Sequence, residues 1–237
     1  MRDTLFTKPN DLVDFAFDQS VAEVFDDMVR RSVPGYQSMI EMIGLITQTY
    51  GQANSHYYDL GASTGATSLA IALNNKQADA KIIAIDNSPE MVSKCRDNLA
   101  DKMDNFEVIC ADIADIEIEN ASLVVLNLTL QFIAPDKRQA LIDHIYQGLN
   151  PGGALIVSEK LHFDDPQQQR RMTELHLDFK RANGYSDLEI AAKRQSIENV
   201  LITDNEQTHL ERFSRAGFAE STKHFQCLNF ASFLAIK

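Results

Sequence analysis

The stretch Tyr57–Gly65, with the sequence YYDLGASTG, decides the fold. Its apolar first half predicts a short buried strand, and Gly61 and Gly65 follow directly. The small residues of Thr67–Leu73 then predict a helix. Glycines between a strand and a helix allow dihedrals and a close backbone approach that a Cβ would forbid. The stretch therefore predicts a ligand-binding loop at the amino end of a helix.

Strands and helices alternate after this loop, which predicts βαβ units and a parallel sheet. The last two predicted strands follow one another without a helix between them, so we expect an antiparallel pair. That ending is typical of a methyltransferase-type sheet, whereas the last strand of a nicotinamide-type sheet is parallel. We expect an α/β fold with a Rossmann-like seven-stranded sheet, mostly parallel, with an antiparallel last strand. The expected strands after the first are Lys81–Ile85, Phe106–Cys110, Ser122–Leu126, Ala154–Ser158, Glu220–Phe225 and Asn229–Ile236.

Helical segments flank this alternation on both sides. Asp18 is the expected cap of an amphipathic helix over residues 19–31. We expect residues 1–50 to form an N-terminal helical lid and residues 160–205 a helical insertion, within one domain of residues 1–237. In the insertion, Ser186-x-x-Glu189 fits a capping box, and Thr203-x-x-Glu206 fits the same pattern.

The net charge of −12 argues against a nucleic-acid partner, because Lys and Arg supply most of the affinity for phosphate backbones. A small-molecule substrate is the better expectation. The three cysteines are scattered, which favours a reducing compartment. The first six residues contain an early acid and no long apolar run, so we expect no signal peptide. No stretch of the chain approaches the roughly 18 to 20 apolar residues that a membrane helix needs, so we expect a cytoplasmic location.

The six histidines show no metal-ligand spacing, so we expect no metal site. Each histidine is expected at a helix end or on the surface.

Polar residues stand at the carboxyl ends of three further predicted strands. Asp86 can accept hydrogen bonds from both hydroxyls of a ribose, and Asp112 can receive an adenine amino group. Asn127 lies where the reactive end of the ligand would be. Open α/β sheets bind ligands at this edge, so these residues and Gly61 together indicate an S-adenosylmethionine site.

Two other interpretations of these residues stay open at this point. Gly61–Gly65 also fits Gly-x-Ser-x-Gly, the nucleophile elbow of hydrolases, although the chain has no HGGG-like segment for an oxyanion hole. Lys193-Arg194 fits a solvated helix face, but a guanidinium there can also clamp a carboxylate.

Three segments resemble the class I S-adenosylmethionine methyltransferase superfamily: Asp59–Gly65, Ile85–Pro89 (IDNSP) and Asn150–Gly153 (NPGG). Four others resemble, more narrowly, the carboxy-S-adenosyl-L-methionine synthase family, and this likeness runs nearly the full length. They are Arg31–Tyr36 (RSVPGY), Ile118–Ser122 (IENAS), Asn127–Phe132 (NLTLQF) and Asp178–Ser186 (DFKRANGYS).

The narrower resemblance implies an enzyme that converts S-adenosylmethionine and prephenate to carboxy-S-adenosylmethionine and phenylpyruvate. The product serves a separate enzyme that modifies the wobble uridine of certain transfer RNAs. The resemblance also implies a homodimer, and we expect its contact in residues 160–205. Arg194 would pair with the added carboxylate, which makes it the expected catalytic residue. The residues expected to contact S-adenosylmethionine are Tyr36, Gly61, Ala62, Ser63, Asp86, Asn87, Asp112, Ile113, Asn127 and Arg194.

One departure from the family pattern is Ala62, where close relatives are expected to have Cys. The residue acts through its backbone, so the departure puts little in doubt.

Two alternatives remain beside the carboxylating enzyme. An ordinary small-molecule methyltransferase would share the cofactor residues but have no use for Arg194. A non-enzymatic S-adenosylmethionine-binding module would tolerate the loss of Arg194.

Overall fold

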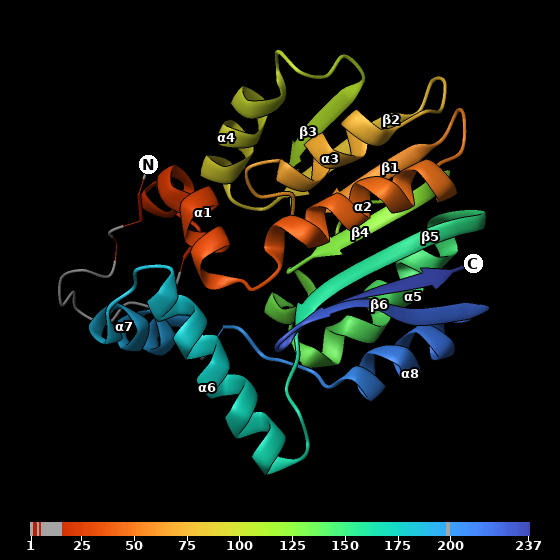
Figure 1. Cartoon of the computed structure of the whole chain (residues 1–237). Helices are drawn as coiled ribbons and strands as arrows, with labels where there is room; N and C mark the ends of the chain where they lie inside the picture. The colour runs from red at the N-terminus through yellow and green to blue at the C-terminus, as the bar shows by residue number, and fades with distance from the viewer. Residues whose placement is uncertain (1, 4, 6–15, 198–199) are drawn as a thin grey trace.

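The computed structural model describes residues 2–3, 5, 16–197 and 200–237. Outside these residues lie parts of the predicted N-terminal lid (residues 1–50) and of the predicted insertion (residues 160–205). Part of the first six residues, which bear on the expected absence of a signal peptide, also lies outside. The described residues form a seven-stranded sheet in the order β3-β2-β1-β4-β5-β7-β6 (Figure 1). The strands are β1 His56–Leu60, β2 Lys81–Asp86, β3 Phe106–Cys110, β4 Ala121–Asn127, β5 Leu149–Lys160, β6 Glu220–Cys227 and β7 Phe230–Ile236.

The predicted topology is confirmed. The five strands from β3 to β5 pair in parallel, and β7 pairs antiparallel with both β5 and β6. β4 lies at the centre, and every residue from Ala121 to Leu126 is buried. Parallel strands covered on both faces are expected to be this apolar.

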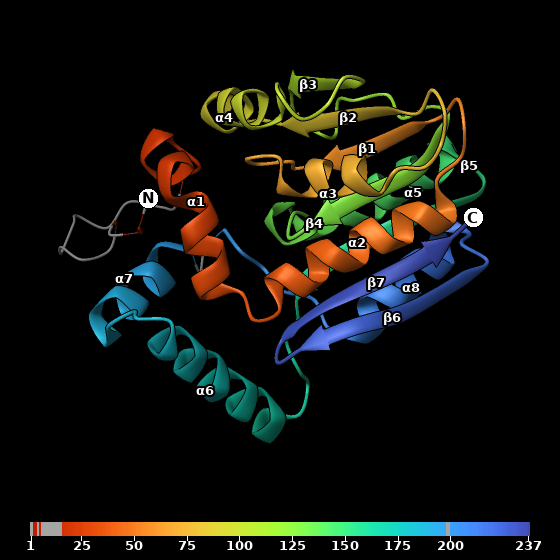
Figure 2. The same ribbon diagram turned by 45° about the horizontal axis from the view of Figure 1, so that its top comes forward.

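Helices cover both faces of the sheet (Figure 2). One apolar core contains side chains of α2, α3 and α4 packed on the sheet, and the other contains side chains of α5 and α8. The cores place helices on opposite faces, which is the three-layer arrangement of doubly wound folds. These helices are α2 Tyr36–Tyr50, α3 Ala66–Asn74, α4 Pro89–Leu99, α5 Arg138–Gly148 and α8 Glu206–Ala216.

The remaining helices stand beyond the sheet rather than on its faces (Figure 1). They are α1 Gln19–Ser32, α6 Pro166–Ala182 and α7 Asp187–Ile197. Asp18 caps α1 by accepting a hydrogen bond from the Val21 N–H, as the sequence predicts. Arg31 Nε donates to the main-chain oxygen of Asn183 at 2.8 Å, so α1 is tied to the end of α6.

Two sequence-based expectations about helix and strand ends are wrong. Asn205, not Thr203, caps α8, because its Oδ1 accepts from the Thr208 N–H at 2.8 Å. The strand expected over Ala154–Ser158 begins earlier, since the Asn150–Gly153 segment lies within β5 and its backbone pairs with the end of the chain. The Ser186–Glu189 capping box is confirmed by hydrogen bonds in both directions.

A buried charge cluster joins the segment after α7 to the sheet. Asp204 accepts from Arg138 at 2.7 Å and from Arg212 at 2.9 Å. Arg138 also donates to the main-chain oxygens of Ile133, Gln131 and Ile202. Burial of a charged group is costly unless it is paired and hydrogen-bonded, and here the guanidinium of Arg138 is both. The cluster fixes the loop after β4 against the chain that leaves the insertion.

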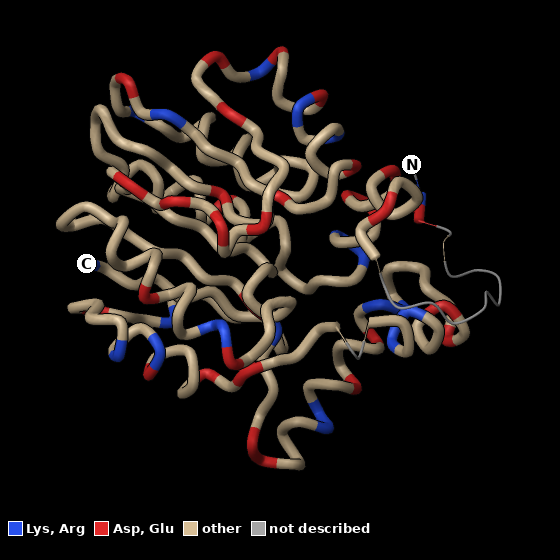
Figure 3. The backbone as a smooth tube through the Cα atoms, turned by 180° about the vertical axis from the view of Figure 1, so that it is seen from behind, with Lys and Arg blue, Asp and Glu red and all other residues tan. Residues whose placement is uncertain are grey.

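Acidic residues are spread over the whole backbone, as the net charge of −12 requires (Figure 3). In the part of the chain that the structure describes, we find no helix that is both long and apolar enough for a membrane span.

Candidate functional site

One cavity of about 840 Å³ opens at the carboxyl edge of the parallel strands. This size is within the range of small-molecule sites. The structure brings together every site residue that the sequence predicts, since all of them line this cavity: Tyr36, Gly61, Ala62, Ser63, Asp86, Asn87, Asp112, Ile113, Asn127 and Arg194.

The loop between β1 and α3 has the backbone that its glycines predict. Gly61 has φ +80°, and a Cβ there would lie 2.5 Å from the side chain of Thr129. Ser63 has φ +50°, which is uncommon for a residue with a Cβ. A strained backbone at a ligand site is held by its surroundings, and here the Ser63 N–H donates to Asp86 Oδ2 at 2.8 Å.

Asp86 therefore has a structural task that the sequence did not reveal. Its second oxygen accepts from the Ser88 N–H at 3.0 Å, so the carboxylate joins the glycine loop to the start of α4. Burial raises the pKa of Asp86, against the two backbone N–H groups that favour the ionised form. The carboxylate still lines the cavity and has lone pairs left for a ligand hydroxyl.

Asn127 and Tyr36 carry polar groups in the wall of the cavity. Asn127 Nδ2 donates to Thr67 Oγ1 at 3.1 Å, whereas its Oδ1 is buried and accepts no hydrogen bond within the described chain. Such an orphaned acceptor in a cavity wall suits a ligand donor. The ring of Tyr36 is buried at the start of α2, and burial raises the pKa of its hydroxyl, which stays protonated.

Asp112 and Asn87 lie on the open side of the cavity and are exposed. The buried side chain of Ile113 also lines the cavity and adds an apolar surface. Asp112 Oδ1 accepts from the Ala114 N–H at 2.9 Å, which orients the carboxylate. A flat apolar ring with an amino group fits such a wall.

Glu159 supports the site but was missed by sequence reasoning. It is 1% exposed, and its two carboxylate oxygens accept from the N–H groups of Leu130 and Gln131 at 2.8 and 3.0 Å. These bonds fix the loop after β4, in which Leu128 has φ +63°. Burial raises the pKa of Glu159 to about 8. A charged residue near the end of a buried strand was the available signal.

Helix α1 closes one side of the cavity. Thr64 Oγ1 donates to Asp26 Oδ1 at 2.7 Å, which ties this helix to the glycine loop. Phe25, Met28 and Val29 of α1 line the cavity. That residues 1–50 act as a lid stays a prediction.

The opposite wall comes from the helical insertion, and one expectation there needs correction. Arg194 is exposed and lines the cavity, as the ligand interpretation requires. Its neighbour Lys193 is 8% exposed and donates to Ser32 Oγ at 2.9 Å, so a fully solvated Lys193-Arg194 face is wrong. The lining residues that were not predicted include Lys160, Lys180 and Asn229.

Two histidines are also buried, against the expectation of helix ends or surface positions. His176 Nε2 donates to the main-chain oxygen of Ser32 at 2.7 Å and joins α6 to α1. Burial lowers its pKa to about 3, so the ring is neutral. His209 stacks on Phe233 in the core. In the described ranges, no group of three or more His, Cys, Asp or Glu residues is placed to hold a metal ion.

Known proteins resemble the chain in both sequence and fold. A family model for a methyltransferase domain, Methyltransf_25, matches residues 58–153. The carboxy-S-adenosyl-L-methionine synthase of Ruthia magnifica subsp. Calyptogena magnifica is 68% identical over 237 residues, which is all of both chains. The chain belongs to the carboxy-S-adenosyl-L-methionine synthase family. A synthase of this family from Citrobacter koseri is 53% identical over 239 residues, covering 100% of this chain and 97% of its own.

Among solved structures, an O-methyltransferase family protein from Burkholderia thailandensis matches with a TM-score of 0.68. The match is 17% identical and covers 93% of this chain and 60% of that protein. This likeness shows the fold, which the carboxy-S-adenosyl-L-methionine synthase family therefore shares with methyltransferases.

Asp59 lies beneath the glycine loop of this family member and is fully buried. Its Oδ2 accepts from Ser68 Oγ at 2.6 Å, and its Oδ1 has no partner within the described residues. Burial, with a smaller contribution from the nearby charge of Asp86, raises the pKa of Asp59 to about 7. The unfolded chain gives up this proton near pH 4, so between about pH 4 and 7 the folded state binds more protons.

We therefore expect Asp59 to lower the free energy of unfolding as pH rises from about 4 to about 7, by about 1.4 kcal/mol for each unit of pKa difference. Asp59→Asn should remove this part of the slope, measured by urea unfolding at several pH values. The exposed Asp104→Asn variant is the matched control and should keep the slope. An unchanged slope in Asp59→Asn would contradict the raised pKa.

Proposed function

We propose that the chain is a transferase that converts S-adenosylmethionine and prephenate to carboxy-S-adenosylmethionine and phenylpyruvate. Full-length identity of 68% to a carboxy-S-adenosyl-L-methionine synthase supports the activity. The observation that carries the proposal is that one cavity has both an acidic wall and a basic wall. A wall of strand ends with Asp86 and Asp112 faces a wall that contains Arg194.

The strand-end wall fits S-adenosylmethionine as a substrate. The backbone of Gly61 and Ser63 leaves room for close approach, since a Cβ at Gly61 would already meet Thr129. Asp86 would accept from the ribose hydroxyls and Asp112 from the adenine amino group. Asn127 would use its orphaned Oδ1 for the amino-acid end, which carries donors.

The reaction balances with these two substrates alone. Prephenate loses carbon dioxide and its ring hydroxyl as the ring becomes aromatic, which leaves phenylpyruvate. The C–H bond of the sulfonium methyl breaks, because the adjacent positive charge makes this proton acidic, and the proton leaves with the hydroxide as water. A C–C bond then forms between the methyl carbon and carbon dioxide. The cavity must keep carbon dioxide in place until that bond forms.

Arg194 would bind the carboxylate that is transferred. A guanidinium presents two parallel N–H groups to a carboxylate, and such charge-assisted bonds are stronger than neutral ones. The guanidinium of Arg194 makes no hydrogen bond or ion pair within the described chain, so its donors are available to a ligand. An ordinary methyltransferase has no added carboxylate and no task for this side chain.

Purified protein given S-adenosylmethionine and prephenate should form carboxy-S-adenosylmethionine, detected by mass spectrometry as S-adenosylmethionine heavier by one carboxyl unit. Arg194→Ala should weaken binding of the carboxylated product by about tenfold to a hundredfold, because a charge-assisted hydrogen-bond pair is lost, and should change S-adenosylmethionine binding much less.

Gln195→Ala, which alters the exposed neighbour on α7, is the control and should leave both affinities unchanged. Recovery of unmodified S-adenosylmethionine alone, without turnover on prephenate, would exclude the carboxylating activity. Equal loss of both ligands in Arg194→Ala would show that this residue has a structural role instead.

We also propose that the product supplies the donor for oxyacetylation of the wobble uridine in transfer RNA. The net charge of −12 supports a division of labour in which another enzyme handles the transfer RNA and this one acts in the cytoplasm on small molecules.

A homodimer through the helical insertion is a further part of the proposal. Leu175 of α6 and Leu188 of α7 are exposed apolar side chains, and Leu188 is 59% exposed. They offer apolar surface on the insertion that a partner subunit would cover. Light scattering at assay concentration should give twice the chain mass, and Leu188→Glu should shift the protein toward the monomer. A wild-type monomer under these conditions would exclude the dimer.

A further inference from the structure

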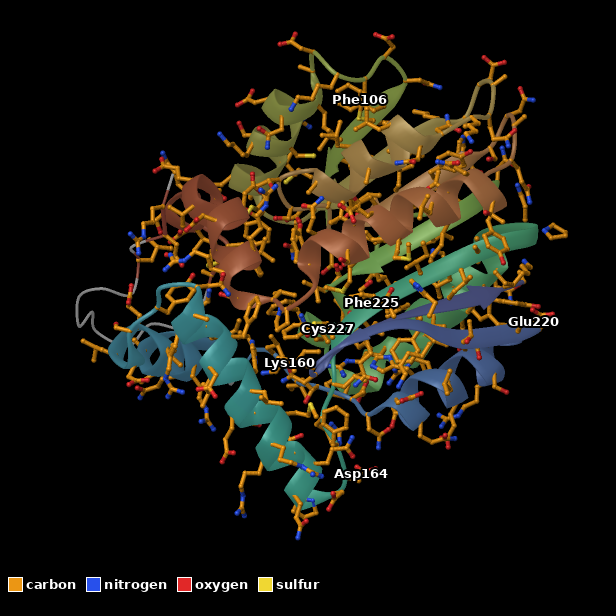
Figure 4. The ribbon with its side chains drawn as sticks, viewed as in Figure 1. Phe106, Lys160, Asp164, Glu220, Phe225 and Cys227 are labelled. Carbon is orange, nitrogen blue, oxygen red and sulfur yellow. The ribbon has the colours of Figure 1, made fainter. Side chains whose placement is uncertain are left out.

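The wall of the cavity opposite the glycine loop gathers basic residues from separate elements. Lys160 ends β5, Lys180 lies on α6, and Arg194 lies on α7. Figure 4 shows Lys160 between the end of the sheet and α6. The charge of Arg194 lowers the pKa of Lys160, and the charges of Lys160 and Arg194 lower the pKa of Lys180. The three side chains therefore lie close enough to interact electrostatically.

These lysines have no acidic neighbour to offset their charge. Within the described residues, the side-chain ammonium groups of Lys160 and Lys180 form no ion pair or hydrogen bond. The carboxylates that the structure places in the cavity wall are Asp86 and Asp112, in the strand-end wall. Burial, with Lys160 and Arg194 nearby, lowers the pKa of Lys180 to about 8. Burial and Arg194 lower the pKa of Lys160. Like charges held together in a partly buried wall are destabilising unless an anion binds between them.

A second observation points to a ligand at the same wall. Asn229 is 3% exposed and lines the cavity where β6 turns into β7. Its main-chain oxygen accepts from the Leu161 N–H at 2.7 Å, which holds it beside the end of β5. Its side-chain Oδ1 is buried without a partner in the described chain. Near the carboxylate that the lysines would hold, the amide can accept from a ligand hydroxyl through Oδ1 and donate to a keto oxygen through Nδ2.

The substrates proposed above leave one carboxylate without a binding residue. Prephenate carries two carboxylates, one transferred and one retained in phenylpyruvate, and Arg194 was assigned to the first. We propose that Lys160 and Lys180 form a separate subsite for the retained 2-oxo acid carboxylate, with Asn229 beside it. This assignment rests on the proposed function and names how the second substrate is held.

The arrangement of the three basic side chains would favour a dicarboxylate over a monocarboxylate. A dianion can engage Arg194 and the lysine pair at the same time, whereas a monocarboxylate leaves one of them unpaired. Holding prephenate at both ends would also fix the position of its ring carboxylate relative to the methyl group of S-adenosylmethionine.

Phenylpyruvate is a direct probe, because its one carboxylate is the retained one. Isothermal calorimetry on the full chain should show phenylpyruvate binding that weakens at least about tenfold in Lys180→Gln and in Lys160→Gln. The same variants should raise the KM for prephenate by a similar factor with a smaller change in kcat. S-adenosylmethionine binding should stay within about twofold of wild type, and Lys180→Arg should recover part of the loss.

Arg171→Gln removes a positive charge from the exposed face of the same helix and is the matched control, with no change expected. Failure of wild-type protein to bind phenylpyruvate, or an unchanged affinity in both lysine variants, would overturn the subsite. An equal loss of S-adenosylmethionine binding would also overturn it, by placing the lysines in the other half of the cavity. Because calorimetry needs no turnover, the subsite can be supported or refuted even if the carboxylating reaction itself is not observed.

Discussion

The parallel pairing of β1 between β2 and β4 is the constraint on which the site depends. Leu60 pairs with Ile85, and Asp59 pairs with Val125, so the three strands end at one edge. The polar residues that follow them must then share that edge, whatever their distance in sequence. Two of these strand ends are also joined directly, since Asp86 accepts a hydrogen bond from the glycine loop. A shift in this register would move the strand ends, and with them the polar residues of the cavity wall, away from one another.

The cavity has negatively charged side chains on one wall and positively charged side chains on the other. Carboxylates at the strand ends suit a ligand with hydroxyls, an amino group and positive charge, whereas the insertion supplies Lys160, Lys180 and Arg194 for a dianion. Attraction between the two substrates would offset part of the cost of holding like charges on each wall. Because α1 is tied to both the glycine loop and the end of α6, it connects the two walls physically. The fold of a methyltransferase can thereby serve a reaction with two bound substrates.

Much of this arrangement was predictable from sequence, and the limits have physical causes. Strand ends and glycine loops leave local patterns, so Gly61, Asp86 and Asn127 were found, and so was the antiparallel last strand. Glu159 and Lys180 were missed as site residues, because their roles depend on contacts with distant segments. Sequence spacing also cannot rank two candidate caps within one turn, which is why Thr203 was considered as a cap where Asn205 caps α8.

The central claim is that one enclosed cavity moves the ring carboxylate of prephenate to the methyl carbon of S-adenosylmethionine. Prephenate labelled with carbon-13 in its ring carboxylate, supplied in buffer with unlabelled bicarbonate, tests it most directly. The account predicts that carboxy-S-adenosylmethionine carries the full label in its new carboxyl group and that phenylpyruvate carries none. Unlabelled product, or label diluted by bicarbonate, would contradict transfer within a closed site.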